Sequence, residues 1–319
     1  MIYTQTNDAS ANAVVAYSRE LEQLGSFPTG GRGSGAAHLP SQGSVVAAAG
    51  RLFVANAGSG ELSVFELDGM SLLATTPTGG GRPVSVAVVE DRAFVLNGGD
   101  EPSIGEISFD GWELESVRPL APGSDPAQVA VTPDGSMLVV SERGTNAISL
   151  LPVGGGSPVS FPSAGATPYG FDFAGGALVV TEAFGGAVGA AAASSYRVED
   201  GTLENVSSSV ADTRSEVCWA VASADGRTVW VTNFGDGTIS RYAVGADGTL
   251  VLADPVAAHT VLGEKGVRDA TRSGDGRFFY ALDADARRVF AWRVEDGGAL
   301  AAAGSADGLP ATVAGLAAL

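Results

Sequence analysis

Six polar residues end apolar, strand-like runs at intervals of about 40 to 50 residues, a spacing typical of repeated units. They are Asn56, Asn97, Glu142, Glu182, Asn233 and Asp283. Two carboxylates on neighbouring copies of one unit can split their pKa values, so that one acts as an acid and the other as a base. Glu142 and Glu182 are therefore candidate catalytic residues. In the alternative interpretation each accepts hydrogen bonds from turn amides, as the asparagines would.

Other distinctive side chains break the repeat on the run that precedes each of these six positions. Arg268 is a candidate catalytic residue that would hold a carboxylate or phosphate, or it pairs with an acidic neighbour such as Asp269. Tyr169 and Trp219 would form an apolar wall for a flat ligand, or they fill the core between units. The other candidate substrate-binding residues are Gln128, Asn233, Arg32 and His38. Arg32 and His38 come from a Gly-rich connector at 29–44, which is either a plain linker between units or a mobile lid that presents them.

A metal site is a further alternative, because the acidic and amide side chains at the ends of the runs are all oxygen ligands. Glu142, Glu182, Asn233 and Asp283 would then surround one cation. We favour a metal-independent site without a cofactor, because the same residues are explained as turn acceptors. Two histidines and one cysteine are too few for a histidine-rich or cysteine-based metal site. The cysteine, Cys218, is predicted to be a small buried side chain rather than a nucleophile.

The elements that must position these residues are short β-strands. Each unit contains two runs of alternating apolar residues around a Gly-rich turn, an earlier strand that often ends in "PDG" or "ADG", and a weaker fourth strand. Four strands in a period of roughly 40–50 residues are typical of a β-propeller blade. Six units are complete, and the N-terminal run and "LPATVAGLAAL" at the C-terminus make a seventh. We therefore predict one all-β domain over residues 1–319, a seven-bladed propeller closed by strands from both termini.

The charge and hydropathy of the chain exclude several classes of protein. A net charge of −18 would repel phosphate backbones, so we predict no binding to nucleic acid. No apolar run reaches the roughly 18 residues of a membrane span, and no leader with a basic and then an apolar region begins the sequence. We expect a cytoplasmic monomer with a small-molecule substrate. A secreted protein whose leader had been removed would have the same sequence.

The repeats "RLFVANAGSGELSVFEL" and "RTVWVTNFGDGTISRYAV", with "VTPDGS" between strands, resemble the bacterial lactonase family of seven-bladed propellers. That family includes 6-phosphogluconolactonase-like and 3-carboxymuconate cyclase-like proteins. The resemblance implies an enzyme that opens, closes or isomerises a ring by acid–base chemistry at the channel mouth. Active members rely on His, Glu and Arg there; Glu142, Glu182 and Arg268 match two of these types, and the first strands carry no His. The alternative is a non-catalytic propeller that binds a protein, a peptide or a small molecule.

Overall fold

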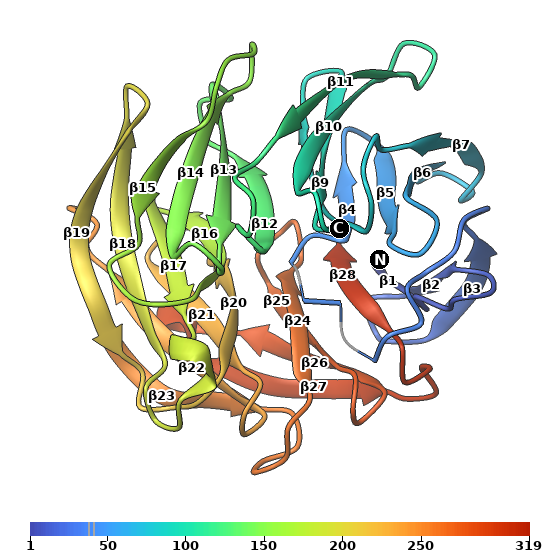
Figure 1. Cartoon of the computed structure of the whole chain (residues 1–319). Coiled ribbons are helices and arrows are strands. Elements are labelled where there is room, and N and C mark those ends of the chain that lie inside the picture. The colour runs from blue at the N-terminus through green and yellow to red at the C-terminus, as the bar shows by residue number, and fades with distance from the viewer. Residues whose placement is uncertain (38, 41) are drawn as a thin grey trace.

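The computed structural model describes residues 1–37, 39–40 and 42–319, and these form seven four-stranded antiparallel sheets around one axis (Figure 1). We number the blades in chain order. Blade 1 contains β4 (Val45–Ala48), β5 (Arg51–Asn56), β6 (Glu61–Glu66) and β7 (Leu72–Pro77). Blade 2 contains β8 (Pro83–Val89), β9 (Arg92–Asn97), β10 (Ser103–Ser108) and β11 (Leu114–Pro119). Blade 3 contains β12 (Pro126–Val131), β13 (Met137–Glu142), β14 (Ala147–Pro152) and β15 (Val159–Pro162).

The second half of the ring repeats the same order of strands. Blade 4 contains β16 (Pro168–Ala174), β17 (Ala177–Glu182), β18 (Ala192–Glu199) and β19 (Thr202–Ala211). Blade 5 contains β20 (Val217–Ala222), β21 (Thr228–Asn233), β22 (Thr238–Val244) and β23 (Leu250–His259). Blade 6 contains β24 (Val267–Arg272), β25 (Phe278–Asp283), β26 (Arg288–Val294) and β27 (Leu300–Ala306). The described residues contain two single 3₁₀ turns, at Phe184–Gly186 and Asp296–Gly298, and no α-helix.

Blade 7 is shared by the two ends of the chain, as the sequence predicted. Its strand order is β28 (Ala314–Ala318), β1 (Ile2–Gln5), β2 (Ala13–Tyr17) and β3 (Gln23–Pro28). The N- and C-termini lie side by side in Figure 1, where β28 runs next to β1. Ile2 pairs with Ala318 and Thr4 with Leu316, and Thr312 Oγ1 donates to the Thr6 carbonyl at 2.7 Å. The seven-bladed fold and its closure are therefore confirmed.

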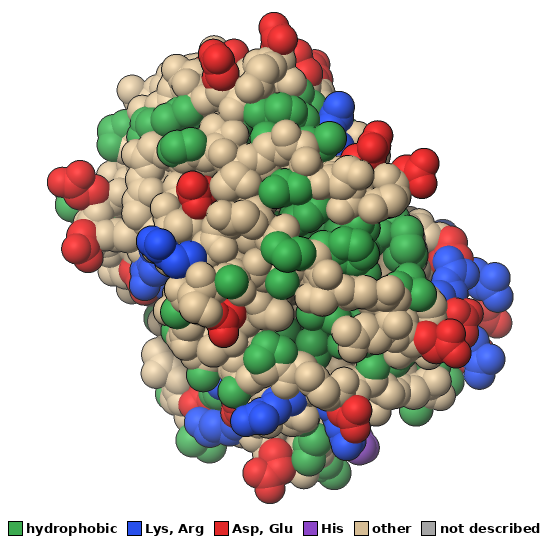
Figure 2. All heavy atoms as spheres, turned by 90° about the vertical axis from the view of Figure 1, so that its right-hand side faces the viewer, with side chains coloured by type: hydrophobic (Ala, Val, Ile, Leu, Met, Phe, Trp, Pro, Cys, Tyr) green, Lys and Arg blue, Asp and Glu red, His purple; other side chains and the backbone are tan. Residues whose placement is uncertain are grey.

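Burial decreases from the axis to the rim, which explains the apolar patterns of the strands. Second strands such as β5, β17 and β21 are buried on both faces, because each lies between neighbouring blades and between two strands of its own sheet. Outer strands such as β11 alternate between exposed and half-buried positions. The core therefore consists of apolar layers between blades, such as the one formed by Trp230, Phe279 and Trp292. On the face shown in Figure 2, hydrophobic side chains gather in the middle and charged ones lie mostly toward the edge.

Polar side chains on the first strands join neighbouring blades around the channel. Gln128 Oε1 accepts from the Phe171 amide at 2.8 Å, and its Nε2 donates to the Phe171 carbonyl at 2.9 Å. Asp172 Oδ2 accepts from the Ala222 amide at 2.7 Å. Each bond reaches the first strand of the next blade. Gln128, which we had predicted to bind substrate, is therefore engaged in holding blades 3 and 4 together.

A buried carboxyl group gives the fold a pH-dependent weak point in blade 5. In three other blades a threonine from the preceding connector donates to the residue that ends the second strand, as Thr78 does to Asn97 at 2.7 Å. Asp212 takes the place of that threonine beside Asn233; both bond to Ser240 Oγ, and Asn233 Oδ1 is buried without a partner among the described residues. Burial raises the pKa of Asp212 from its usual 3.8 to about 6. The protonated carboxyl would supply the donor that Asn233 lacks.

We expect Asp212→Thr to stabilise the protein at high pH, because threonine donates a hydrogen bond without ionising. The pKa of Asp212 is higher in the folded than in the unfolded state, so the protonated carboxyl stabilises the fold. This stabilisation is fully present below pH 3.8 and is lost as the pH rises through about 6. The stability advantage of the variant should therefore grow by about 1–2 kcal/mol between pH 5 and pH 8. Urea unfolding at several pH values measures it. An advantage that did not change with pH would contradict the titration of Asp212.

Candidate functional site

A pocket of about 450 Å³ lies at the end of the propeller where the first strands begin. Blades 3 to 6 supply its walls: side chains come from the starts of β16, β20 and β24 and from the residues that follow β13 and β21. The polar and aromatic residues that line it are Asp125, Arg143, Thr167, Tyr169, Glu216, Phe234 and Arg268, with Cys218. The sequence brought Tyr169 and Arg268 into the same predicted site, and the structure places both in this pocket.

Two arginines of the pocket lining are held against aromatic rings. Arg143 Cζ lies 4.9 Å from the Tyr169 ring centroid, and Arg268 Cζ lies 4.6 Å from that of Phe234. Arg143 Nη1 also donates to the Tyr169 hydroxyl at 3.0 Å. Stacking fixes the plane of a guanidinium, and an anion would reach its edge by replacing the present partners, which for Arg143 are Asp125 and Tyr169. Both arginines line the pocket together with Cys218.

The counter-ions of these arginines lie on the solvent side. Arg143 Nη2 is 2.8 Å from Asp125 Oδ1, and Arg268 Nη2 is 2.8 Å from Asp285 Oδ1. Both aspartates are about half exposed, whereas the two arginine side chains are largely buried. Water reaches each pair from the aspartate side and screens it, so an incoming anion can compete with the aspartate for the guanidinium. Arg268 Nε is buried and has no hydrogen-bond partner within the described part of the chain.

Glu216 is the carboxylate that the pocket places beside this positive charge. It directly precedes β20, and both of its oxygens accept from Lys265 Nζ, at 2.8 and 2.9 Å. Lys265 Nζ lies 5.4 Å from the centroid of the Phe234 ring that also carries Arg268. The pocket lining thus combines two cations, two carboxylates and two hydroxyls. These groups can bind an anion, stabilise an oxyanion and transfer a proton.

The thiol and the phenol in the pocket remain in their neutral forms. Burial raises the pKa of Cys218 to about 12, against the opposing effect of the nearby Arg268. Burial also raises the pKa of Tyr169, and Arg143 lowers it by a smaller amount. Cys218 is buried, in agreement with its prediction as a small core side chain. Tyr169 can therefore act as a hydrogen-bond donor or acceptor but not as a base at neutral pH.

The two glutamates predicted as an acid–base pair do not line this pocket. Glu142 is buried in blade 3 and accepts from Ser149 Oγ and Thr145 Oγ1, both at 2.6 Å. Glu182 is buried in blade 4 and accepts from the Gly165 amide at 2.7 Å, with Ser194 and Ser209 as further donors. Each carboxylate bonds hydroxyls of its own blade, and Glu182 also bonds an amide of the connector before its blade. The structure therefore favours the alternative in which they are structural acceptors.

The remaining predicted residues are only partly brought together. Trp219 is fully buried beneath Tyr169, with ring centroids 4.7 Å apart, and its Nε1 donates to the Arg268 carbonyl; it supports the pocket from the core. Asn233 is buried in its blade and donates to Thr238 and Ser240. Arg32 is exposed on the connector before blade 1, outside the lining of this pocket. His38 lies outside the described residues.

The four residues of the metal alternative also stay in separate blades. Asp283, for example, accepts from Thr260 Oγ1 of the preceding connector at 2.6 Å and from the Ala286 amide of its own blade turn at 2.8 Å. Among residues 1–37, 39–40 and 42–319, no three His, Cys, Asp or Glu side chains are grouped so that they could hold a metal ion. The described residues likewise form no helix that could span a membrane.

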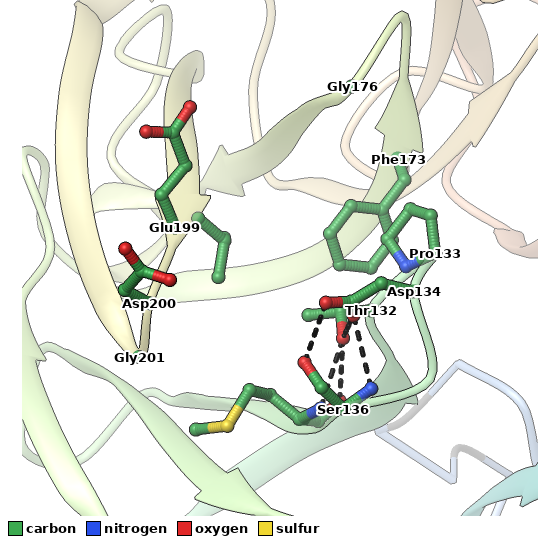
Figure 3. Close-up of a pocket in the computed structure, with 11 residues that line it drawn as sticks. Thr132, Pro133, Asp134, Ser136, Phe173, Gly176, Glu199, Asp200 and Gly201 are labelled. Atoms are coloured by element: carbon green, nitrogen blue, oxygen red, sulfur yellow. Dashed lines mark hydrogen bonds between the residues drawn. The ribbon is translucent and has the colours of Figure 1, made fainter.

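The opposite end of the propeller has a pocket of different character. It has a volume of about 430 Å³ and lies between the turns of blades 3 and 4, where Asp134, Glu199 and Asp200 face it (Figure 3). The Asp134 carboxylate accepts from Thr132 Oγ1 at 2.5 Å and from the Ser136 amide and hydroxyl. These bonds lower its pKa to about 2. Because its side chains carry only negative charge, this pocket suits an anionic ligand less than the pocket at the other end.

Comparison with known proteins connects the chain to one family of propellers. Residues 179–312 match the family model described as "Lactonase, 7-bladed beta-propeller". This stretch, which is less than half of the chain, is similar to that family. It contains Glu216, Phe234, Lys265 and Arg268, and the match confirms the resemblance predicted from the repeats. No protein of curated function matches the chain significantly in sequence.

Solved structures with the same fold include several lactonase-type propellers. A candidate 6-phosphogluconolactonase from Bacteroides fragilis superposes with a TM-score of 0.74 at 17% identity, covering 99% of this chain and 96% of that one. A periplasmic gluconolactonase from Pseudomonas aeruginosa gives 0.73 at 18%, covering 98% and 99%. A functionally unknown protein from Desulfotomaculum acetoxidans gives 0.74 at 14%, covering 98% and 97%. At these identities the comparisons show a shared fold.

Sequence analysis missed three residues that define the charge of the pocket: Arg143, Glu216 and Lys265. Arg143 directly follows Glu142, the residue that the break in the repeat had indicated. Glu216 precedes a first strand, at a place where Asp125 and Thr167 also adopt positive φ angles, of 43° and 59°. The repeat could have revealed this position, because its residue type changes in every blade while its place before the strand does not.

Proposed function

We propose that the chain is a lactonase-type hydrolase that opens a small anionic lactone in the pocket of blades 3 to 6. The observation that carries the proposal is the convergence of Arg143 and Arg268 with the Glu216 carboxylate on one pocket. The lactonase-family match of residues 179–312 covers two of these three residues and supports the same class of reaction. Two proteins of the same fold are described as gluconolactonase-type enzymes, which makes sugar-acid lactones the first substrates to test.

The residues divide the reaction between them. Arg268 binds the anionic group of the substrate, and Arg143 stabilises the oxyanion that forms when water attacks the lactone carbonyl. Glu216 accepts a proton from that water as the carbon–oxygen bond forms. The ring carbon–oxygen bond then breaks, and the ring oxygen takes a proton back from Glu216 to become a hydroxyl group. The product is the open hydroxy acid.

We expect Arg268→Ala to raise KM for an anionic lactone by about 10- to 100-fold, because a charge-assisted hydrogen bond contributes about 1.5–3 kcal/mol. The assay follows acid release from glucono-1,5-lactone and its 6-phosphate, corrected for spontaneous hydrolysis. Arg288→Ala is the matched control, because Arg288 lies in the same blade and pairs with exposed Asp307 at 3.7 Å, away from the pocket.

Wild-type rates no faster than spontaneous hydrolysis across a panel of anionic and neutral lactones would contradict the proposal. Saturable binding of gluconate without turnover would support the alternative of a non-catalytic binding propeller. The predicted monomeric state, the cytoplasmic location and the lack of nucleic-acid binding stay predictions, to be measured by light scattering, cell fractionation and gel shift.

A further inference from the structure

Lys265 is the single lysine of the chain, and it lies at the rim of the proposed active site. The other 17 of the 18 Lys and Arg residues are arginines. The lysine belongs to the connector between β23 and β24. Its ammonium group bonds both oxygens of Glu216, the carboxylate to which we assign proton transfer. A base held in this way has no oxygen free of the ammonium group.

The ion pair is weak enough to exchange partners. The Lys265 side chain is 56% exposed and that of Glu216 is 27% exposed. Pairs of this exposure contribute about 0–1 kcal/mol, because water screens the charges and two long side chains must be ordered. An anion that already contacts the pocket arginines has the same charge as Glu216 and competes for the same ammonium group.

The position of Lys265 places such an anion within its reach. Lys265 and Arg268 both stack on the Phe234 ring, at 5.4 and 4.6 Å from its centroid. The two cations therefore share one aromatic neighbour, whose ring lines the pocket. An anionic group bound by Arg268 also lies in the field of Lys265.

We propose that Lys265 exchanges partners when the substrate binds: the anionic group of the ligand replaces Glu216 at Nζ, and the released Glu216 carboxylate becomes the base. This inference rests on the proposed function, and it couples the availability of the base to the occupancy of the site. No covalent bond changes in the exchange, and the proton that Glu216 later accepts comes from the attacking water.

Lysine suits this role better than arginine does. An ammonium group is a compact charge with three equivalent donors on a flexible stem, so it can turn from one anion to another. A guanidinium binds a carboxylate through two parallel bonds in a fixed plane and would hold Glu216 in place. Lys265→Arg is therefore expected to lower kcat more than it raises KM.

The test uses the one lysine as a spectroscopic probe. Reductive methylation with ¹³C-formaldehyde labels Lys265 and the N-terminal amine while keeping both charges, so the spectrum contains two sites. Titration with sodium gluconate should move the Lys265 signal saturably and leave the N-terminal signal in place. Isothermal calorimetry measures the gluconate Kd of the unlabelled protein and its variants.

Opposite changes in two variants distinguish exchange from a structural ion pair. Glu216→Gln should tighten gluconate binding about 3- to 10-fold, because the competing carboxylate is gone. Lys265→Met should weaken it about tenfold, because a charge-assisted contact is lost. The matched control is the exposed pair Arg293–Glu295, whose Nε and Oε1 atoms are 3.2 Å apart. Arg293→Met and Glu295→Gln should leave the Kd unchanged.

Two different results would overturn the inference. Saturable gluconate binding with an unmoved Lys265 signal, and with equal Kd values in both pocket variants, would reject the exchange and leave the proposed function intact. No saturable binding of gluconate or of 6-phosphogluconate to the wild-type protein would reject the anion site, and with it both proposals.

Discussion

Glu216→Gln should lower kcat for lactone hydrolysis by about 10²–10⁴-fold, which is the usual contribution of a positioned base. The amide keeps the size and hydrogen-bonding reach of the side chain but cannot accept a proton from water. We expect KM to stay level or fall, because glutamine does not compete for Lys265 Nζ, which Glu216 holds at 2.8 Å. Initial rates over a range of lactone concentrations separate the two parameters.

The control for this variant is Glu295→Gln, an exposed change far from the pocket that should leave both parameters unchanged. Glu142→Gln and Glu182→Gln extend the comparison. Their carboxylates accept hydrogen bonds from buried serine hydroxyls on the third strands of their own blades, so we expect these variants to lose stability. Full turnover in Glu216→Gln, together with loss of turnover in Glu142→Gln or Glu182→Gln, would return the proton transfer to the pair predicted from the sequence.

Deletion of residues 309–319 should open the ring and lower Tm by about 10 °C or more. The deletion removes β28, which is the axial strand of blade 7, together with the buried side chains of Leu309, Val313 and Leu316. Burial of each such side chain contributes about 1.5–3 kcal/mol, and the total approaches the stability of a typical domain. The edge of β1 would also be exposed and open to pairing with another chain.

A milder pair of variants tests the same closure if the shortened chain does not fold. Leu316→Ala removes a side chain that is 4% exposed and should cost about 2–5 kcal/mol. Leu319→Ala removes one that is 40% exposed and should change the free energy of unfolding by less than about 0.5 kcal/mol. Equal unfolding midpoints for the two variants would show that the terminal strand does not close the ring.

The stretch that matches the family model contains part of the pocket lining. The match covers residues 179–312, which form parts of blades 4 to 6. The pocket takes Tyr169 from just before that range, and Arg143 and Asp125 from blade 3. A ring of rigid sheets can bring these residues together because all of them lie at the same end of consecutive blades.

The fold could be predicted from the sequence because a propeller repeats one four-stranded unit at a regular spacing. Residues such as Asn56 and Asn97 recur at matching places, and the alternating patterns around them define the strands. The split seventh blade also followed from the sequence, since one strand was missing at the start and one was left at the end. Tyr169 and Arg268 were identified because they break the repeat on first strands, and those strands begin at the pocket.

What only the tertiary structure decided was the direction and the partners of each polar side chain. Glu142 and Arg143 are adjacent in sequence, yet Glu142 is buried at the end of β13 and Arg143 lines the pocket. Successive residues of a strand point to opposite faces, and the turn that follows adds a rotation that no spacing rule supplies. The ion pair of Glu216 with Lys265 joins residues 49 positions apart. Such a pair forms because two neighbouring blades close against each other, and the sequence of either blade alone does not contain that contact.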